Sequence, residues 1–255
     1  ETVQDILQLE EITLELGMGL IPLGSPSGGS LPSKLRSLRT RFAADFGFVL
    51  PTIQIRDSME LDNFEYKLLI HGVEAAKGAV YPNMRLVMAP SGKSMPPIKG
   101  EDTTDPVFGI PARWIDPTLT DEADALGCTV ASADGIVLTH ISEAVKDNME
   151  QLLTYSAAER LINNLDPEYA KLMRDSVPNI VSMITIQRVL QELLAERVSI
   201  RNLPTILEAI VEAAGFTRNI PMMVEHVRQK IGAVICAPLL DASRRRRRLH
   251  RLGAG

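Results

Sequence analysis

The strongest constraint on the fold is a repeating pattern of aliphatic residues in the second half of the chain. Between Met183 and Val198, apolar side chains recur at steps of three and four, the period of an amphipathic α-helix. The inward positions are Ile186, Val189, Leu190, Leu193 and Leu194. Similar stripes begin near Ile136 and continue through Ile200–Ala214 and Pro221–Cys236. This half therefore predicts a compact helical bundle.

The residues before the bundle mix helix and strand signals. One helix is expected over Leu31–Phe46, where apolar residues follow the helical period and Gly47 ends it. Gly24–Ser30 is expected to be a flexible linker. Strands are expected over Phe48–Arg56, Tyr66–Val73 and Met84–Ala89. The predicted fold class is α+β with several subdomains.

Composition is that of an ordinary soluble protein, but the charge is uneven. Of the 255 residues, 45% are apolar and 23% charged, and no apolar stretch approaches the roughly 20 residues that span a bilayer. Without the six arginines of the run Arg244–Arg251, 21 basic residues face 32 acidic ones. This acidic body argues against nucleic-acid binding, and the run is expected to be a solvated tail. Cys128 and Cys236 are expected to be buried thiols of a reducing compartment.

Catalytic chemistry finds little support in the sequence. The histidines are His71, His140, His226 and His250. None has a metal-ligand spacing to another His, Cys or carboxylate, and no glycine-rich phosphate loop or serine elbow occurs. Asp57, Glu60 and Asp62 could act as paired acids, although solvated loop carboxylates are far commoner at this spacing. We therefore expect no enzymatic activity, no cofactor and no metal.

The segment Thr103–Ile115 stands out by its content of aromatic residues, prolines and one acid. Asp105-Pro106 favours a turn, because proline fixes its own φ and pushes the preceding residue out of the α region. A short, stiff segment that displays Asp105 and Phe108 side by side is suited to contact with a partner. The alternative is a packed β-turn whose aromatic residues belong to the core, and chemistry alone favours that alternative.

Motifs spread along the chain occur in an order typical of one family. They are ELGMGLIPL at 15–23, Lys34–Pro51, Ile55–Asp57, TDPVFG at 104–109 with Trp114-Ile115, LTHI at 138–141, and Gln187–Glu208. Over roughly Glu11–Ala237 the chain thus resembles the export-gate family of bacterial flagellar and injectisome type III secretion systems (the FlhA/SctV, or LcrD-type, family). The intact Asp-Pro-x-Phe-Gly and Thr-His motifs favour the flagellar branch.

The resemblance implies a division into subdomains. Family members have a mixed α/β subdomain, a small β-rich subdomain inserted into it, an all-helical subdomain and a fourth, C-terminal one. The matching residues here are 12–82 with 133–152, then 83–132, and then 153–237. Residues 1–11 would end a linker to a membrane half that this sequence lacks. Residues 238–255, a basic and presumed disordered tail, stand where the fourth subdomain is expected.

The resemblance also implies a role in protein export. Family members assemble a nonameric ring at the cytoplasmic face of the inner membrane, dock chaperone–substrate complexes, contact other export components and help to order export. In flagellar members the docking cleft uses the residues that match Asp105, Phe108 and Thr139. Phe108 would anchor in an apolar pocket, while Asp105 and Thr139 orient the partner by hydrogen bonds or by pairing with a cation. Gly17 is a candidate hinge between open and closed arrangements.

Three other interpretations stay open at this point. An injectisome homologue would share these motifs but differ in its substrates. A soluble helical adaptor that forms no ring would carry the same acidic body and leucine stripes, and concentration-dependent ring formation separates the two. An enzyme based on Asp57, Glu60 or His140 would need a ligand or metal that the sequence does not signal.

Overall fold

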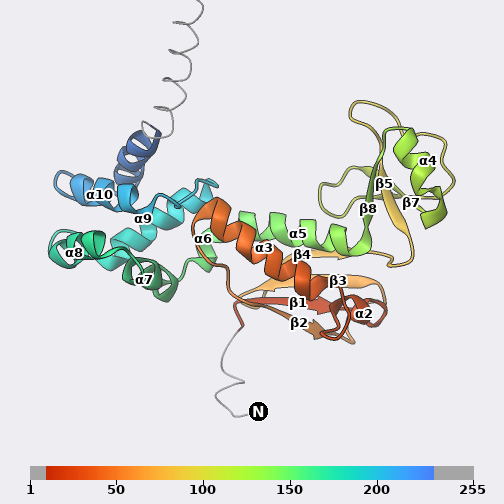
Figure 1. The fold of residues 1–255 in the computed structure, drawn as a ribbon, viewed down its shortest axis with the longest axis horizontal. Helices are drawn as coiled ribbons and strands as arrows, with labels where there is room; N and C mark the ends of the chain where they lie inside the picture. Colours follow the sequence, from red (N-terminus) through yellow and green to blue (C-terminus); the bar gives the residue numbers. More distant parts are fainter. Residues whose placement is uncertain (1–9, 233–255) are drawn as a thin grey trace, which may run out of the picture. The chain divides into compact units, whose positions relative to one another are not determined.

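A computed structural model of the protein describes residues 10–232, which form two compact units (Figure 1). The first unit holds the described residues up to Arg41 together with Val49–Asn148, and the second holds Phe42–Phe48 and the described residues from Met149 onwards. The arginine run and Cys236, for which a solvated tail and a buried thiol are expected, lie outside the described residues.

The first unit is built on two four-stranded sheets, with orders β2-β1-β3-β4 and β6-β7-β5-β8. β1 and β2 run parallel, and all the other neighbours are antiparallel. The strands of the first sheet are β1 (Ile12–Leu16), β2 (Ile53–Asp57), β3 (Glu65–Ile70) and β4 (Val73–Ala79). Those of the second sheet are β5 (Arg85–Met88), β6 (Glu101–Thr104), β7 (Pro111–Ile115) and β8 (Thr129–Ser132).

Two long helices cover one face of the first sheet, α3 (Leu31–Phe46) and α5 (Ala133–Asp147) (Figure 1). Lys34 of α3 and Asp134 of α5 form an ion pair of 2.7 Å between them. The second sheet has its own small core, which consists of Val87, Ile98, Ile115, Ala123 and Cys128. The short elements of the unit are η1 (Met18–Leu20), α2 (Ile21–Gly24), η2 (Pro117–Leu119) and α4 (Thr120–Ala125).

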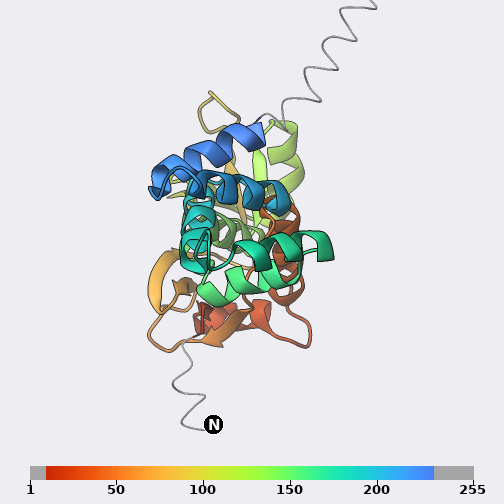
Figure 2. The same cartoon turned by 90° about the vertical axis from the view of Figure 1, so that its left-hand side faces the viewer.

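The second unit, which faces the viewer in Figure 2, is made of helices. They are α6 (Met149–Leu152), α7 (Tyr155–Asn163), α8 (Pro167–Ser176), α9 (Met183–Ala195), α10 (Leu203–Ala214) and the helical residues 220–232. α9 packs against α6, α7 and α10, and its five predicted inward residues are fully buried. The side-chain amide of Gln187 donates from α9 to the carbonyl oxygen of Leu153 (3.1 Å), the residue directly after α6.

The helices over Leu31–Phe46 and from Met183 are confirmed, as is a fold that mixes α and β elements. The expected strand Tyr66–Val73 is confirmed as far as Ile70, and its continuation to Val73 is wrong, because His71 and Gly72 adopt positive φ and turn the chain between β3 and β4. Gly24–Ser30 was expected to be a flexible linker, but it forms a turn in which the Gly29 amide donates to the carbonyl oxygen of Ser25 (2.8 Å). The subdomain boundaries stay predictions.

Candidate functional site

The segment Asp105–Gly109, here called the display turn, connects β6 to β7 at the edge of the second sheet. The amide of Asp105 donates to the carbonyl oxygen of Ile110 (2.8 Å), and the amide of Gly109 donates to that of Asp105 (3.0 Å). Gly109 has φ +67, a conformation that a residue with a side chain adopts only with strain. The turn is therefore closed by its own backbone.

The two predicted contact residues of the display turn point in opposite directions. Asp105 is only 3% exposed, and its Oδ2 accepts a hydrogen bond from the amide of Phe108 (2.7 Å). Phe108 is 61% exposed, and Ile110 beside it is also exposed. The expectation that both side chains are displayed is thus correct for Phe108 and wrong for Asp105. The carboxylate is buried because it satisfies a backbone amide of the turn.

A buried polar pair lies close to Asp105. The hydroxyl of Tyr66, on β3, lies 2.6 Å from Nδ1 of His140, on α5, and the two rings meet edge to face. Burial, and then the negative charge of Asp105, raise the pKa of Tyr66. Burial lowers the pKa of His140, although the charge of Asp105 acts in the opposite direction. Sequence analysis missed Tyr66, since it resembles any other inward residue of an alternating strand.

Thr139 is exposed on α5, and its hydroxyl donates to the carbonyl oxygen of Gly135 one turn earlier (2.9 Å). It directly precedes His140, whose ring lies near enough to Asp105 to respond to its charge. The structure therefore joins Asp105 to Phe108 by a hydrogen bond, while the hydroxyl of Thr139 bonds within α5.

Gly17, the candidate hinge, lies where two backbones approach each other. A Cβ placed on Gly17 would overlap the carbonyl oxygens of Asp62 and Asn63, and the Gly17 amide donates to the carbonyl oxygen of Glu65 (2.9 Å). Its φ of −65 is open to any residue. Gly17 is needed for this close contact, and hinge motion at this position stays a prediction.

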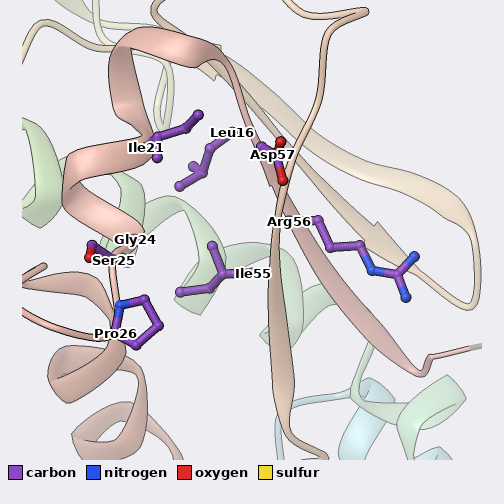
Figure 3. A pocket seen from close by; sticks show the side chains of 8 residues that line it. All are labelled: Leu16, Ile21, Gly24, Ser25, Pro26, Ile55, Arg56 and Asp57. Carbon is purple, nitrogen blue, oxygen red and sulfur yellow. The ribbon is translucent and has the colours of Figure 1, made fainter. Parts of the chain in front are cut away.

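A hollow of about 340 Å³ lies beside the edge strand β2 (Figure 3). Apolar side chains line it from β1, α2 and β2, and Arg56 and Asp57 lie at its rim. Arg56 pairs with Glu10 (2.7 Å). Of the candidate catalytic and binding residues, only Asp57 lines the hollow, which offers an open, mostly apolar surface.

The residues weighed as catalytic acids do not form a site. Asp57, Glu60 and Asp62 are all exposed. Within residues 10–232 no group of three or more His, Cys, Asp or Glu side chains could hold a metal ion. In the same part of the chain, no helix combines the length and the apolar character needed to cross a membrane.

Comparison with known proteins first defines the fold. The chain superposes on Chlamydia pneumoniae CdsV in its complex with CdsO with a TM-score of 0.76, at 20% identity, covering 90% of this chain and 67% of that one. The nonameric SctV-C of EPEC gives a TM-score of 0.66 at 18% identity, covering 88% and 66%. The protein thus has the fold of CdsV and SctV-C.

Sequence comparison then gives the family. Residues 1–250 match the FHIPEP family, and the chain belongs to it. The flagellar biosynthesis protein FlhA of Caulobacter vibrioides is 38% identical over 237 residues, which are 92% of this chain and 34% of that protein. FlhA of Bacillus subtilis is 38% identical over 238 residues, or 93% and 35%. The chain spans about a third of the length of these relatives. The resemblance drawn from the motifs is confirmed.

Proposed function

We propose that the chain is part of the export gate of a flagellar type III secretion system, where it docks chaperone–substrate complexes and helps to order their export. Family membership and the FlhA relatives support this role. The relatives named above are flagellar proteins at 38% identity, whereas the injectisome domains share the fold at 18–20%, so we favour the flagellar branch. No catalytic step, cofactor or metal belongs to this function.

The observation that carries the proposal is an exposed phenylalanine on a braced turn. Exposed aromatic side chains held in one conformation are effective anchors, because little conformational entropy is lost when a partner binds. Phe108 and Ile110 both expose apolar side chains to a partner. The buried carboxylate of Asp105 holds the turn by accepting a hydrogen bond from the Phe108 amide. Thr139 supplies a hydroxyl whose oxygen can still accept a hydrogen bond from the partner. Asp105 therefore acts on the partner through the shape of the turn.

The proposal includes the setting in which the site works. We infer that the chain lies at the cytoplasmic face of the inner membrane, that copies of it assemble into a ring, and that the ring is a nonamer like the EPEC SctV-C structure. Mass photometry over a range of concentrations tests the ring. A chain that stays monomeric throughout would instead support a helical adaptor that forms no ring.

The docking site is tested by calorimetric titration of the 255-residue chain with the cognate flagellar chaperone–substrate complex. We expect Phe108→Ala to weaken binding by at least about 2 kcal/mol, or roughly 30-fold, as is typical of an anchor residue. Phe216→Ala is the matched control, because Phe216 is 62% exposed and lies in the helical unit. Equal affinities of the parent and Phe108→Ala would exclude the display turn as the docking site.

A further inference from the structure

Two side chains near the display turn, Tyr66 and His140, come from two other elements of the first unit. Tyr66 is fully buried on β3, and its hydroxyl group reaches the ring of His140 on α5. These two residues are separated by 74 positions in the sequence. The hydrogen bond between them therefore fixes the distance between β3 of the first sheet and the helix that carries Thr139.

Pro106 of the turn and the Tyr66 hydroxyl both lie beside Gly78. A Cβ placed on Gly78, which is paired with Tyr66 across β3 and β4, would lie 2.6 Å from the Tyr66 hydroxyl and 2.9 Å from Cβ of Pro106. Both groups therefore occupy the space that a side chain at Gly78 would need. Because Pro106 follows Asp105, this places the tyrosine hydroxyl near the start of the turn.

Burial makes the hydrogen bond between Tyr66 and His140 important for the fold around the turn. A fully buried hydroxyl group needs a hydrogen-bond partner, and Nδ1 of His140 provides it. The charge of the buried Asp105 carboxylate acts on both groups, and its hydrogen bond from the Phe108 amide holds the backbone of the display turn at that residue.

We propose that Tyr66 and His140 are positioning residues, which hold the display turn in the conformation that presents Phe108 to the partner; this inference rests on the proposed function. Neither residue needs to touch the partner. The pair pre-organises the turn, so that the free protein already has the binding conformation. Substitutions at Tyr66 or His140 should therefore change binding only while Phe108 is present. A substitution that merely lowers stability would change binding whether or not Phe108 is present.

The test is a double-mutant cycle with Tyr66→Phe, Phe108→Ala and the combined variant, each titrated with the cognate chaperone–substrate complex. Tyr66→Phe keeps the ring and removes only the hydroxyl, and Tyr155→Phe, at an exposed tyrosine of α7, is the matched control. Loss of one hydrogen bond predicts binding weakened about three- to tenfold by Tyr66→Phe. In the Phe108→Ala background the same change should have no further effect.

Amide hydrogen exchange measured by NMR adds a readout that needs no partner. Tyr66→Phe should speed exchange of the Phe108 amide and leave exchange in the helical unit unchanged. Unchanged exchange and affinity, or a loss of affinity that is equal in both backgrounds, would overturn the positioning role. If the parent chain did not bind, the proposed function would fail, and exchange at Phe108 alone would decide whether the pair shapes the turn.

Discussion

Helix α9 and the display turn depend on different kinds of buried groups. The inward residues of α9, in the helical unit, are all aliphatic and fully buried, so this helix is held by apolar packing. Near the display turn, the first unit buries the carboxylate of Asp105 and the hydroxyl of Tyr66, each held by a hydrogen bond. Apolar packing is non-directional, whereas buried polar groups demand specific partners. The shape of the display turn therefore depends on specific partners.

The largest expected effect lies in the helical unit. Leu190→Ala should lower the free energy of unfolding by about 2–5 kcal/mol, because it removes a fully buried side chain from α9 and leaves a cavity. Ile184→Ala, on the same helix but at a position 59% exposed, should change it by less than about 0.5 kcal/mol. Denaturant unfolding measures both. Similar losses for the two variants would show that α9 does not pack through its aliphatic stripe.

The next effect concerns close backbone approach in the first unit. Gly17→Ala should destabilise by about 1–3 kcal/mol, because its Cβ would overlap the carbonyl oxygen of Asp62 and one of the two segments must move. Gly28→Ala is the control, since a Cβ there meets nothing within 4 Å. Thermal unfolding of the two variants compares them. If Gly17→Ala were as stable as Gly28→Ala, the backbone at Gly17 and at Asp62 could move apart at little cost in free energy.

A smaller effect is expected at the ion pair between α3 and α5. Burial alone would raise the pKa of Asp134, but hydrogen bonds from Lys34 and Ser132 outweigh it and hold that pKa well below its usual range. The stabilisation is therefore present above the unfolded pKa of about 3.9 and is lost as the pH falls towards the lowered value. Asp134→Asn should cost about 1 kcal/mol at pH 7. Unfolding curves of the parent and of Asp134→Asn at pH 7 and pH 3 should show that their difference in stability is smaller at pH 3. A difference that is the same at both pH values would contradict this role of the Asp134 charge.

The smallest effect is a pH dependence from His140. Burial lowers its pKa, so the neutral ring is favoured in the folded state. Its contribution to stability is present above the unfolded pKa of about 6.5 and declines as the pH falls below that value. His140→Gln should therefore flatten the slope of stability against pH between about pH 5 and 7. If stability had the same slope against pH in the parent and the variant, the charge of Asp105 would offset the effect of burial on the pKa of His140.

Local patterns explain which parts could be predicted from the sequence. The burial of α3 and α9 follows the period of their own residues, so both helices were found without knowledge of their neighbours. β1 is harder, because Ile12, Leu14 and Leu16 alternate over only five residues and pair with strands far along the chain. The turn at His71-Gly72 was missed because the apolar residues on both sides suggested one continuous strand.

The candidate site shows the same limit. The composition of the display turn drew attention to Phe108, whose exposure depends mainly on its own loop. Asp105 instead points inward and accepts a hydrogen bond from the amide of Phe108, which the composition of the segment does not predict. The sequence therefore indicated the segment, but only the structure showed that Asp105 is buried and Phe108 is exposed.

The most direct test of this division compares the unfolding of two variants in the absence of any partner. Asp105→Ala removes the charged acceptor of the Phe108 amide and should lower the free energy of unfolding by about 1–3 kcal/mol. Phe108→Ala removes an exposed side chain and should change it by no more than about 0.5 kcal/mol. Equal effects of the two substitutions, or a larger loss for Phe108→Ala, would contradict a turn that Asp105 builds and Phe108 presents.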